Sequence, residues 1–323
     1  MRRTLRRKNL FCFIFVLLSV LAFQSIQAQE YPTKPVTLVI PLSAGGSHDL
    51  TARAVITVAK KYLGQPIVIL NKPGGGGAIG TEAVANAAPD GYTLLLGWPG
   101  SSTTLPAVMG RSKGPDDFVP VCLLNYSTTM IVARSDLPYK TFNQFLDWIK
   151  ANPGKLVFGT TGVWGNTDVA WKQISKLTGV SAKVVPYDGG GPVVIAFLGD
   201  QIDATGMAIA PLLAHVRTGK LRILATLGEK REWNFPDVPT ARELGVDVVN
   251  HNWRGVMVPK GTPRPIVEKL AMAFKKMTED KSVIDTIREQ LGDEMHYKGP
   301  EEFAKYWRDE YEAHKELGKL YKK

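Results

Sequence analysis

A strand, a glycine turn and a helix follow one another without a break over residues 36–62, and this segment limits the fold more than any other. Val36–Ile40 is a short apolar run, mostly β-branched, which is typical of a strand buried on both faces. Pro41 ends the strand. Gly45 and Gly46 lie in the turn, where glycine permits a left-handed backbone and leaves no Cβ to obstruct a ligand. N–H groups at the start of the following helix would then face outward from the carboxyl edge of a sheet, a suitable place for an anion. An ordinary strand-to-helix connection closed by glycine would show the same pattern, so both interpretations stay open.

The helix expected after this turn has recognisable ends and one apolar face. Ser47 or Asp49 can cap its N-terminus, and Gly64 ends it. Residues at four-residue spacing predict the buried face: Leu50, Ala54, Val58 and Tyr62. We therefore expect one continuous amphipathic helix after the glycine turn.

The first 28 residues differ in composition from the rest of the chain. Arg2–Lys8 is strongly basic, Leu10–Phe23 is an apolar run, and a polar tail ends at Ala28. This order is typical of a secretory signal peptide, so we expect cleavage after Ala28. An uncleaved membrane anchor is the alternative, but the apolar run is shorter than the roughly 20 residues that span a bilayer.

Charge and cysteine content exclude some classes of function. The full chain has 40 basic and 30 acidic residues; removing residues 1–28 leaves 35 basic residues and a net charge of +5. These charges are spread along the chain without an arginine stripe, which argues against a nucleic-acid partner and weakly favours anionic small molecules. Cys122 is the only thiol outside the signal peptide, so we expect no intramolecular disulfide. It lies in an apolar run and should pack as a small buried hydrophobe.

The unit of strand, glycine loop and helix recurs along the chain. This alternation predicts an α/β protein with mostly parallel sheets, and the chain is long enough for two lobes. Residues 97–104 should form a loop of small and hydroxylic residues that carries Trp98, and the tail from Pro263 should be helical and pack on the first lobe. Trp98 and Trp164 can stack on a ligand or cover the edge of a lobe. The expected strands cover 67–70, 92–96, 121–133 with a polar interruption at 125–129, 156–159 and 221–226, and the expected helices cover 79–88, 142–150, 168–177 and 193–198.

Motifs for nucleotide binding and catalysis are weak in this sequence. A G-x-G-x-x-G pattern spans Gly75–Gly80, but three residues separate it from the strand, and no acidic residue ends the next strand. The side chains of Ser47, His48 and Asp49 have the residue types of a catalytic triad, yet consecutive side chains point apart. The five histidines are scattered without the spacing of a zinc site and should lie at the surface or in caps. We expect no metal, no cofactor and no catalytic residue.

Ordered motifs cover nearly all of the chain after the signal peptide. They are Tyr31-Pro32, Lys34-Pro35, Pro41, Gly45-Gly46-Ser47, Asp49, Arg53, Gly64-Gln65-Pro66, Asn71, Pro73-Gly74, Gly77 to Gly80, Pro89-Asp90-Gly91-Tyr92-Thr93, Val185-Pro186-Tyr187, Gly219-Lys220-Leu221-Arg222, Pro236-Asp237-Val238-Pro239-Thr240, Trp253-Arg254-Gly255 and Gly261-Thr262-Pro263. With these motifs the chain resembles the periplasmic substrate-binding proteins of the tripartite tricarboxylate transporters, also called Bug-type or TctC-like receptors.

The resemblance implies a two-lobed type II periplasmic binding fold, often compared to a Venus flytrap, with a mostly parallel sheet in each lobe. We expect residues 1–28 to be the signal peptide, 29–126 and 252–323 to form lobe 1, and 127–251 to form lobe 2. The resemblance also implies a periplasmic receptor that closes on a small carboxylate and delivers it to a membrane permease, and we expect it to be a monomer. A periplasmic hydrolase and a ligand-sensing receptor for a membrane signalling protein are the alternatives.

In this family the glycine loops hold a ligand carboxylate mainly through main-chain N–H groups and ordered water. By position, the first two loops would be 43–49 and 74–80 here, and Asp49 is the side chain that we expect to matter most in the first. The predicted ligand-binding residues are Ser43, Ala44, Gly45, Gly46, Ser47, Asp49, Gly76, Gly77, Ala78, Trp98, Ser101, Thr160, Thr161, Gly162, Trp164, Asn166, Thr167, Tyr187, Asp188 and Gly189.

The second-lobe loops depart from the family pattern. The family commonly has Gly-x-Gly-Ser with a nearby His, whereas this chain has Gly162-Val163-Trp164-Gly165 with Asp168 at the His position. The usual Tyr-Lys-Gly is Tyr187-Asp188-Gly189. Relative to the family pattern, these loops lack a cationic side chain and carry in addition the indole of Trp164 and the carboxylate of Asp188. We therefore predict a monocarboxylate with an aromatic or apolar body, or one with a hydrogen-bond donor for Asp188, which can also be an ordinary turn residue.

Overall fold

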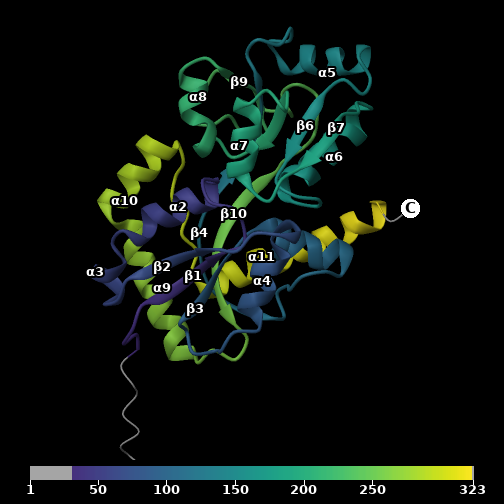
Figure 1. The fold of residues 1–323 in the computed structure, drawn as a ribbon. Helices are drawn as coiled ribbons and strands as arrows, with labels where there is room; N and C mark the ends of the chain where they lie inside the picture. Colours follow the sequence, from purple (N-terminus) through teal and green to yellow (C-terminus); the bar gives the residue numbers. More distant parts are fainter. Residues whose placement is uncertain (1–30, 322–323) are drawn as a thin grey trace, which may run out of the picture. The chain divides into compact units, whose positions relative to one another are not determined.

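The computed structural model describes residues 31–321, so the predicted signal peptide lies outside the described residues. From Lys34 onward the chain forms one compact unit. It contains two five-stranded sheets, each with its own helices, which can be followed by their labels in Figure 1. We call the sheet that contains β1 and its helices the first lobe, and the sheet that contains β6 and its helices the second lobe.

The first sheet has the strand order β2-β1-β3-β10-β4. β1 pairs in parallel with β2 and β3, whereas β10 runs antiparallel to both of its neighbours. The carboxyl ends of β1, β2 and β3 therefore share one edge. The strands are β1 (Val36–Ile40), β2 (Ile67–Asn71), β3 (Thr93–Gly97), β4 (Phe118–Thr128) and β10 (His251–Pro259).

The second sheet repeats this plan with the order β7-β6-β8-β5-β9. β6 is parallel to β7 and β8, and β5 is the antiparallel strand in the position that β10 takes in the first sheet. The predicted α/β class with mostly parallel sheets is confirmed. The strands are β5 (Met130–Arg134), β6 (Val157–Thr160), β7 (Lys183–Pro186), β8 (Ala204–Met207) and β9 (Leu221–Thr226).

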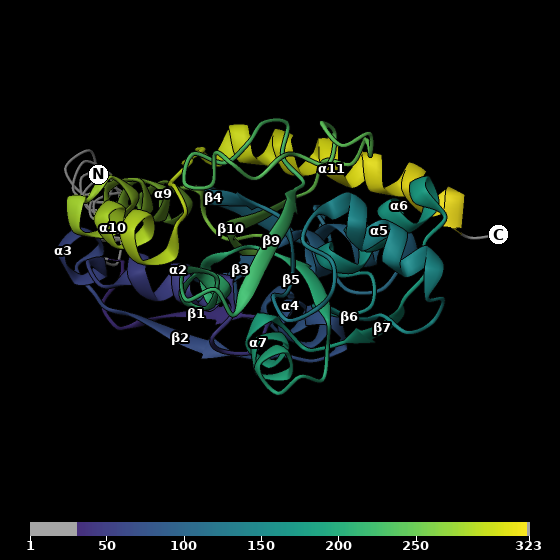
Figure 2. The same ribbon diagram turned by 90° about the horizontal axis from the view of Figure 1, so that it is seen from above.

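Helices follow the strands and cover the sheets. The tail forms helices as predicted, with α9 and α11 packed against β4, and Figure 2 shows α11 (yellow) passing along the β4 side of the sheet. In the first lobe they are α2 (Ser47–Ile56), α3 (Ala59–Leu63), η2 (Gly75–Gly77), α4 (Ala78–Ala85), η3 (Gly100–Met109), α9 (Arg264–Glu279), α10 (Lys281–Asp285), η5 (Thr286–Gln290) and α11 (Pro300–Tyr321). In the second lobe they are α5 (Phe142–Ala151), α6 (Asn166–Thr178), α7 (Gly190–Leu198), η4 (Ala210–Leu212) and α8 (Leu213–Arg217).

The single helix expected over residues 47–62 is wrong, because α2 and α3 are separated at Thr57 and Val58. Ile56, Thr57 and Val58 are consecutive β-branched residues, which lose χ1 freedom in a helix. Because of the break, the residues that face the protein interior differ from those that a single helix would bury. The fully buried apolar side chains are Ala52, Val55, Ala59 and Leu63 together with the predicted Ala54, whereas Leu50, Val58 and Tyr62 are half-buried. Neither Ser47 nor Asp49 is the N-cap, which is Gly46 without a capping side chain.

The loop expected at residues 97–104 is also wrong, because most of it belongs to the π-helix η3. The ring of Trp98 lies against Gly100, where an added Cβ would come within 2.4 Å of the indole. Thr103 and Thr104 face α11, where they bond Glu310 and His314. Small residues thus allow this segment to coil tightly between the tryptophan and the last helix.

The polar interruption expected at 125–129 is shorter than predicted, since β4 continues to Thr128. Asn125 and Ser127 stay in the strand because both side chains bond Asp293. Cys122 is fully buried, as predicted, and burial raises the pKa of its thiol far above the ordinary value. The predicted apolar face of α5 is likewise confirmed by the burial of Phe145 and Ile149.

Candidate ligand-binding site

The two lobes meet through glycine-rich loops. The N–H and the Oγ of Ser43, after β1, both donate to the carbonyl oxygen of Asp188, at 2.9 and 2.8 Å. Nearby, a Cβ added to Gly46 would lie only 3.1 Å from the backbone N of Gly190. A second close approach joins Gly162 to Gly76, where the corresponding distance to Cα is also 3.1 Å. Backbone therefore faces backbone across the junction between the lobes, which side chains at these positions would prevent.

The side chain of Asp49 fixes the start of α2 through hydrogen bonds to the loop before the helix and to neighbouring side chains. Its carboxylate accepts from the N–H of Gly45 at 3.0 Å, from Arg53 Nε at 2.9 Å and from Asn71 Nδ2 at 3.1 Å. Burial alone would raise the pKa of Asp49, but these hydrogen bonds hold the pKa below its ordinary value. The side chain is 3% exposed and shapes the loop rather than lining a cavity.

The start of α6 uses the same arrangement. Asp168 accepts from the N–H of Trp164 at 2.8 Å and from Lys172 Nζ at 2.6 Å, and Gly165 is the N-cap. Trp164 adopts a φ of +59°, a left-handed conformation that is unfavourable for a bulky residue. Its half-buried indole has Lys172 Nζ 5.0 Å from the ring centroid.

A third helix, α7, also begins at the junction, after Gly189 in the left-handed region. The first turns of α2, α6 and α7 meet around a small enclosed cavity of about 10 Å³. First-turn N–H groups have no partner within their own helix, and the positive ends of three helix dipoles therefore point to one place. The cavity is lined by Leu42, Ser43, Gly46, Ser47, His48, Trp98, Thr161, Thr167, Gly190, Met207, Ala208 and Asn252.

Ser43 also lines a much larger cavity, of about 1050 Å³. It is lined by residues from both lobes: Ser43, Gly75, Gly76, Ala78, Glu82, Leu105, Met109, Gly110, Arg111, Ser112, Lys113, Gly162, Val163, Trp164, Pro186, Tyr187, Asp188 and Pro192. The lining includes the apolar or aromatic side chains of Leu105, Met109, Val163, Trp164 and Tyr187, and its charged residues, Glu82, Arg111, Lys113 and Asp188, are of both signs. This cavity can hold the body of an organic ligand.

The structure brings many of the predicted site residues together at these two cavities. Those that line a cavity are Ser43, Gly46, Ser47, Gly76, Ala78, Trp98, Thr161, Gly162, Trp164, Thr167, Tyr187 and Asp188. The others line neither cavity: Ala44 and Gly45 are exposed, and Asp49, Gly77, Ser101, Thr160, Asn166 and Gly189 are buried. Asn166, for example, bonds Thr129 and Asn250 where the chain crosses between the sheets.

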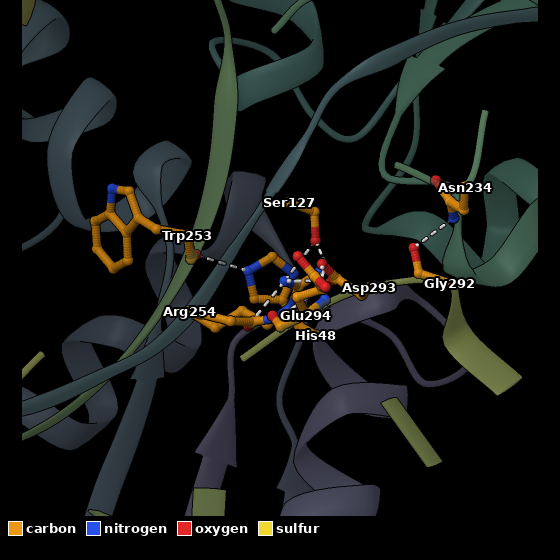
Figure 3. Close-up of polar contacts among 9 residues, drawn as sticks. His48, Ser127, Asn234, Trp253, Arg254, Gly292, Asp293 and Glu294 are labelled. Carbon is orange, nitrogen blue, oxygen red and sulfur yellow. Dashed lines mark hydrogen bonds and ion pairs between the residues drawn. The ribbon is translucent and has the colours of Figure 1, made fainter. Parts of the chain in front are cut away.

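His48 was expected at the surface or in a cap, and this expectation is wrong. The side chain is 3% exposed and lines the enclosed cavity from the second position of α2. Its Nε2 bonds the carbonyl oxygen of Trp253 (dashed line in Figure 3) at 3.3 Å. Its ring meets the ring of Trp98 edge-on, with 5.9 Å between the centroids. Burial, with the nearby charge of Arg254, holds the pKa of His48 well below the ordinary value, so the imidazole is neutral. The sequence contained one indication of this position. His48 comes directly before Asp49, as Thr167 comes directly before Asp168, and the two residues take the same second position in α2 and α6.

Trp98 does not stand in an exposed loop, and it is 1% exposed. Within the part of the chain that the structure describes, its indole Nε1 has no hydrogen-bond partner. Asn252, 7% exposed, likewise has an unpartnered Oδ1 among the described residues. Both residues line the enclosed cavity, although the Trp98 Nε1 itself lies toward Gly77, where an added Cβ would come within 2.9 Å of it.

Arg254 lies beside His48 with a fully buried guanidinium (Figure 3). Its Nη1 donates to Asn125 Oδ1 at 3.0 Å and to Ser127 Oγ at 2.7 Å, and pairs with Asp293 at 3.3 Å. This cluster connects β10 and β4 to the segment before α11 and holds a positive charge behind the cavity.

The geometry does not assemble a triad from Ser47, His48 and Asp49. Asp49 bonds Gly45, Arg53 and Asn71, while His48 faces Trp253. Residues 31–321 contain no group of three or more His, Cys, Asp and Glu side chains able to hold a metal ion. Over the same residues, none of the helices combines the length and apolar character required to cross a membrane.

Comparison with known proteins decides the family. The sequence model of the tripartite tricarboxylate transporter family receptor matches residues 51–321. The chain belongs to this family. It is 34% identical to the protein BugT of Bordetella pertussis over 273 residues, which cover 82% of each chain.

Solved structures of the receptor family agree with this assignment. The periplasmic binding protein BugD is similar with a TM-score of 0.85 and 31% identity, over 90% of this chain and 98% of that one. MatC from Rhodopseudomonas palustris with bound malate is similar with a TM-score of 0.84 and 30% identity, over 89% of this chain and 100% of that one. The fold is therefore the two-lobed type II periplasmic binding fold, and the family is one of substrate-binding receptors rather than enzymes.

Proposed function

We propose that this receptor binds a small carboxylate between its lobes and delivers it to a tripartite tricarboxylate-type membrane permease. The observation that carries the proposal is the convergence of the first turns of α2, α6 and α7 on one enclosed cavity. Each is a full helix of nine residues or more, so each supplies several unpaired N–H groups. Export through the predicted signal peptide, a periplasmic location and a monomeric state belong to the same proposal, as does the lobe boundary near residues 126–127 and 251–252.

Backbone groups alone can supply the affinity. A helix N-terminus contributes about 0.3–1 kcal/mol toward an anion, and a hydrogen bond to a charged group about 1.5–3 kcal/mol. Three or four such bonds approach the roughly 8 kcal/mol of a micromolar ligand. The enclosed cavity has room for about one water-sized group, so the lobes must separate slightly to admit a carboxylate.

The larger cavity supports a ligand with an apolar or aromatic body. Trp164, Leu105 and Met109 line it, and the indole of Trp164 is presented by an unfavourable backbone conformation. Such strain is retained where the surrounding structure requires the side chain in that place. Asp188 adds a carboxylate that can accept a hydrogen bond from the ligand, because its side chain lies at the exposed edge of this cavity.

The proposal is tested by measuring the melting temperature of the purified receptor against matched pairs of acids and their neutral amides. Acetate, phenylacetate, succinate and adipate would be compared with acetamide, phenylacetamide, succinamide and adipamide. A bound acid at a hundred times its Kd should add about 2.7 kcal/mol and raise Tm by a few degrees. We expect phenylacetate to exceed acetate and the amides to have no effect. Equal stabilisation by an acid and its amide would contradict charge recognition by the helix ends.

A further inference from the structure

A carboxyl group lies behind the part of β10 that borders the enclosed cavity. Glu310 Oε2, on α11, accepts from Trp253 Nε1 at 2.6 Å and from Thr103 Oγ1 at 2.8 Å. Trp253 directly follows Asn252, which lines the enclosed cavity, and its carbonyl oxygen bonds His48 of the same lining (Figure 3). One residue, Trp253, therefore connects the carboxyl group of Glu310 to the lining of the ligand cavity.

Both hydrogen-bond partners of this carboxyl group are neutral. Glu310 is half-buried as a residue, but its carboxyl group points inward to Trp253 and Thr103, which are fully buried. An indole N–H and a hydroxyl carry no charge that could offset that of a carboxylate. Burial accordingly raises the pKa of Glu310 to about 7, although both hydrogen bonds favour the ionised form. The group therefore exchanges its proton in a pH range where a carboxylic acid in solution is fully ionised.

Other titratable groups surround Glu310. Burial raises the pKa of Tyr306 and lowers that of His314 to about 4, so both stay neutral near pH 7. His251 and His296 contact the ring of Tyr126 and line a separate pocket where the lobes join, so experiments must distinguish them from Glu310. The helix η3 carries no acidic or basic residue. The titratable and charged groups on the elements packed around Glu310 are Tyr306 and His314 on α11, Tyr126 on β4, His251 and Arg254 on β10, Glu229 after β9, and His296 before α11.

An ionised Glu310 and a carboxylate in the enclosed cavity repel each other. One tryptophan and one imidazole separate the carboxyl group from the cavity. Two charges on the order of 10 Å apart, at an effective dielectric constant of about 20, change a binding constant about tenfold. The protonated carboxyl group lacks this repulsion. Because linkage is reciprocal, the bound anion raises the proton affinity of Glu310 by the same factor.

We propose that Glu310 links ligand binding to protons: it takes up a proton from solvent when the carboxylate binds and returns it when the carboxylate leaves. The affinity of the receptor therefore falls as the pH rises through neutrality. This inference rests on the proposed function, because it concerns anion binding at the same cavity. Glu310 acts through its charge and through Trp253 rather than by contact with the ligand.

Calorimetry with the purified receptor and phenylacetate tests the inference. Titrations at pH 7.5 in phosphate and in Tris, whose ionisation enthalpies differ, count the protons taken up. We expect about 0.5 proton per ligand at pH 7.5, and a Kd that increases about tenfold between pH 6 and pH 9. Acetate repeats the measurement without the aromatic ring, so a poor fit of the ring does not decide the result.

Variants assign the proton to a residue. Glu310→Gln stays neutral, so it should bind at pH 6 to 9 with the Kd that wild type has at pH 6, and without proton uptake. Glu312→Gln removes an exposed carboxylate of the same helix, paired with Lys315, and should behave as wild type. His251→Gln and His296→Gln should keep the uptake.

Two results would overturn the inference while leaving the carboxylate site intact. One is a wild-type Kd that is equal at pH 6 and pH 9 without proton uptake. The other is an uptake that survives in Glu310→Gln, which would place the titrating group elsewhere, at a histidine if His251→Gln or His296→Gln removes it. Absence of binding by every acid at pH 6 would refute the proposed function, and the inference with it.

Discussion

The helices α2 and α6 lie in different lobes but begin in the same way. Each follows a glycine N-cap, Gly46 or Gly165, and each has an aspartate at its third position, Asp49 or Asp168. Each aspartate accepts from the N–H four residues earlier and from a cation four residues later. The shared arrangement leaves the first-turn N–H groups facing the junction between the lobes.

The two helix starts differ at the residues that meet the cavity. The left-handed position is Gly45 in the first lobe, with φ +79°, and Trp164 in the second, with φ +59°. The second helical position is His48 in one and Thr167 in the other, and both line the enclosed cavity. The comparison teaches that the scaffold for an anion is common to both lobes, whereas the groups that can discriminate between ligands are placed unequally on it.

The same substitution should affect different properties at the two N-cap glycines: the stability of the fold at Gly165 and the binding of the ligand at Gly46. A Cβ at Gly165 would come within 2.5 Å of Thr161 O in its own lobe, whereas the nearest atoms to a Cβ at Gly46 belong to Gly190 and Gly191 of the other lobe, at 3.1 Å or more. Gly165→Val should therefore destabilise the fold by about 2–4 kcal/mol. Gly46→Val should leave the ligand-free Tm nearly unchanged but weaken ligand binding about a hundredfold, equivalent to about 3 kcal/mol.

Thermal melts and calorimetry on both variants check this prediction. Gly299→Val is the control, because an added Cβ there meets no heavy atom within 4 Å. Tight ligand binding by Gly46→Val would contradict closure of the loops against each other.

Glu310, a buried carboxyl on α11, should make the stability of the first lobe depend on pH. Glu310 Oε2 accepts from Trp253 Nε1 at 2.6 Å and from Thr103 Oγ1 at 2.8 Å, and Trp253 is also the residue that fixes His48. Burial raises the pKa of Glu310 to about 7, although both hydrogen bonds oppose the shift. A carboxyl with a raised folded pKa contributes stability below its unfolded pKa near 4.5, and this stability is lost as pH rises through 7.

Glu310→Gln, which cannot ionise, should therefore be more stable than wild type at pH 8, by on the order of 2 kcal/mol. At pH 4.5 the two proteins should melt at nearly the same temperature. Burial lowers the pKa of the neighbouring His314 to about 4, so this group stays neutral over most of the window. Equal stability changes at both pH values would count against a buried, titrating Glu310.

Asp49→Asn tests the carboxylate beneath the α2 loop. The substitution should cost about 1–2 kcal/mol at pH 7, because the charge-assisted bonds to Arg53 and Gly45 are weakened. The folded pKa of Asp49 lies below its unfolded value near 3.8, so the contribution is present above that value and is lost as pH falls through the folded pKa. Chemical denaturation at pH 7 and pH 3 should show the difference shrinking at the lower pH. A difference that is independent of pH would contradict this account.

Exchange of the left-handed residues should have the smallest effect on stability. Gly45→Ala should cost about 1 kcal/mol of stability from backbone strain alone, since its Cβ would lie 3.8 Å from Gly191 Cα, an ordinary contact.

Trp164→Gly should leave the stability of the fold nearly unchanged, because relief of backbone strain offsets the lost contacts of the indole. It should weaken binding of aromatic acids several-fold relative to acetate, measured by calorimetry. Unchanged phenylacetate binding would remove Trp164 from the ligand site.

Much of the scaffold could be predicted from the sequence, because strands, glycine turns and helix starts are local patterns. The strand β1, the glycine turn after it and the buried face of α5 follow from local patterns, whereas the break between α2 and α3 and the buried face of α2 do not. The burial of Trp98 and the π-helix η3 could not be predicted, since both depend on packing against Gly100 and α11, which is distant in sequence. Arg111 was missed for a similar reason, because it reaches the larger cavity only from the end of that π-helix.

The most direct test of the central claim is a crystal structure of the receptor with a bound carboxylate. We predict that the carboxylate oxygens lie within hydrogen-bond distance of N–H groups in the first turns of α2, α6 and α7. The body of the ligand should extend past Ser43 toward Trp164. A carboxylate held instead by Arg111 or Lys113 in the larger cavity, away from all three helix starts, would contradict the account.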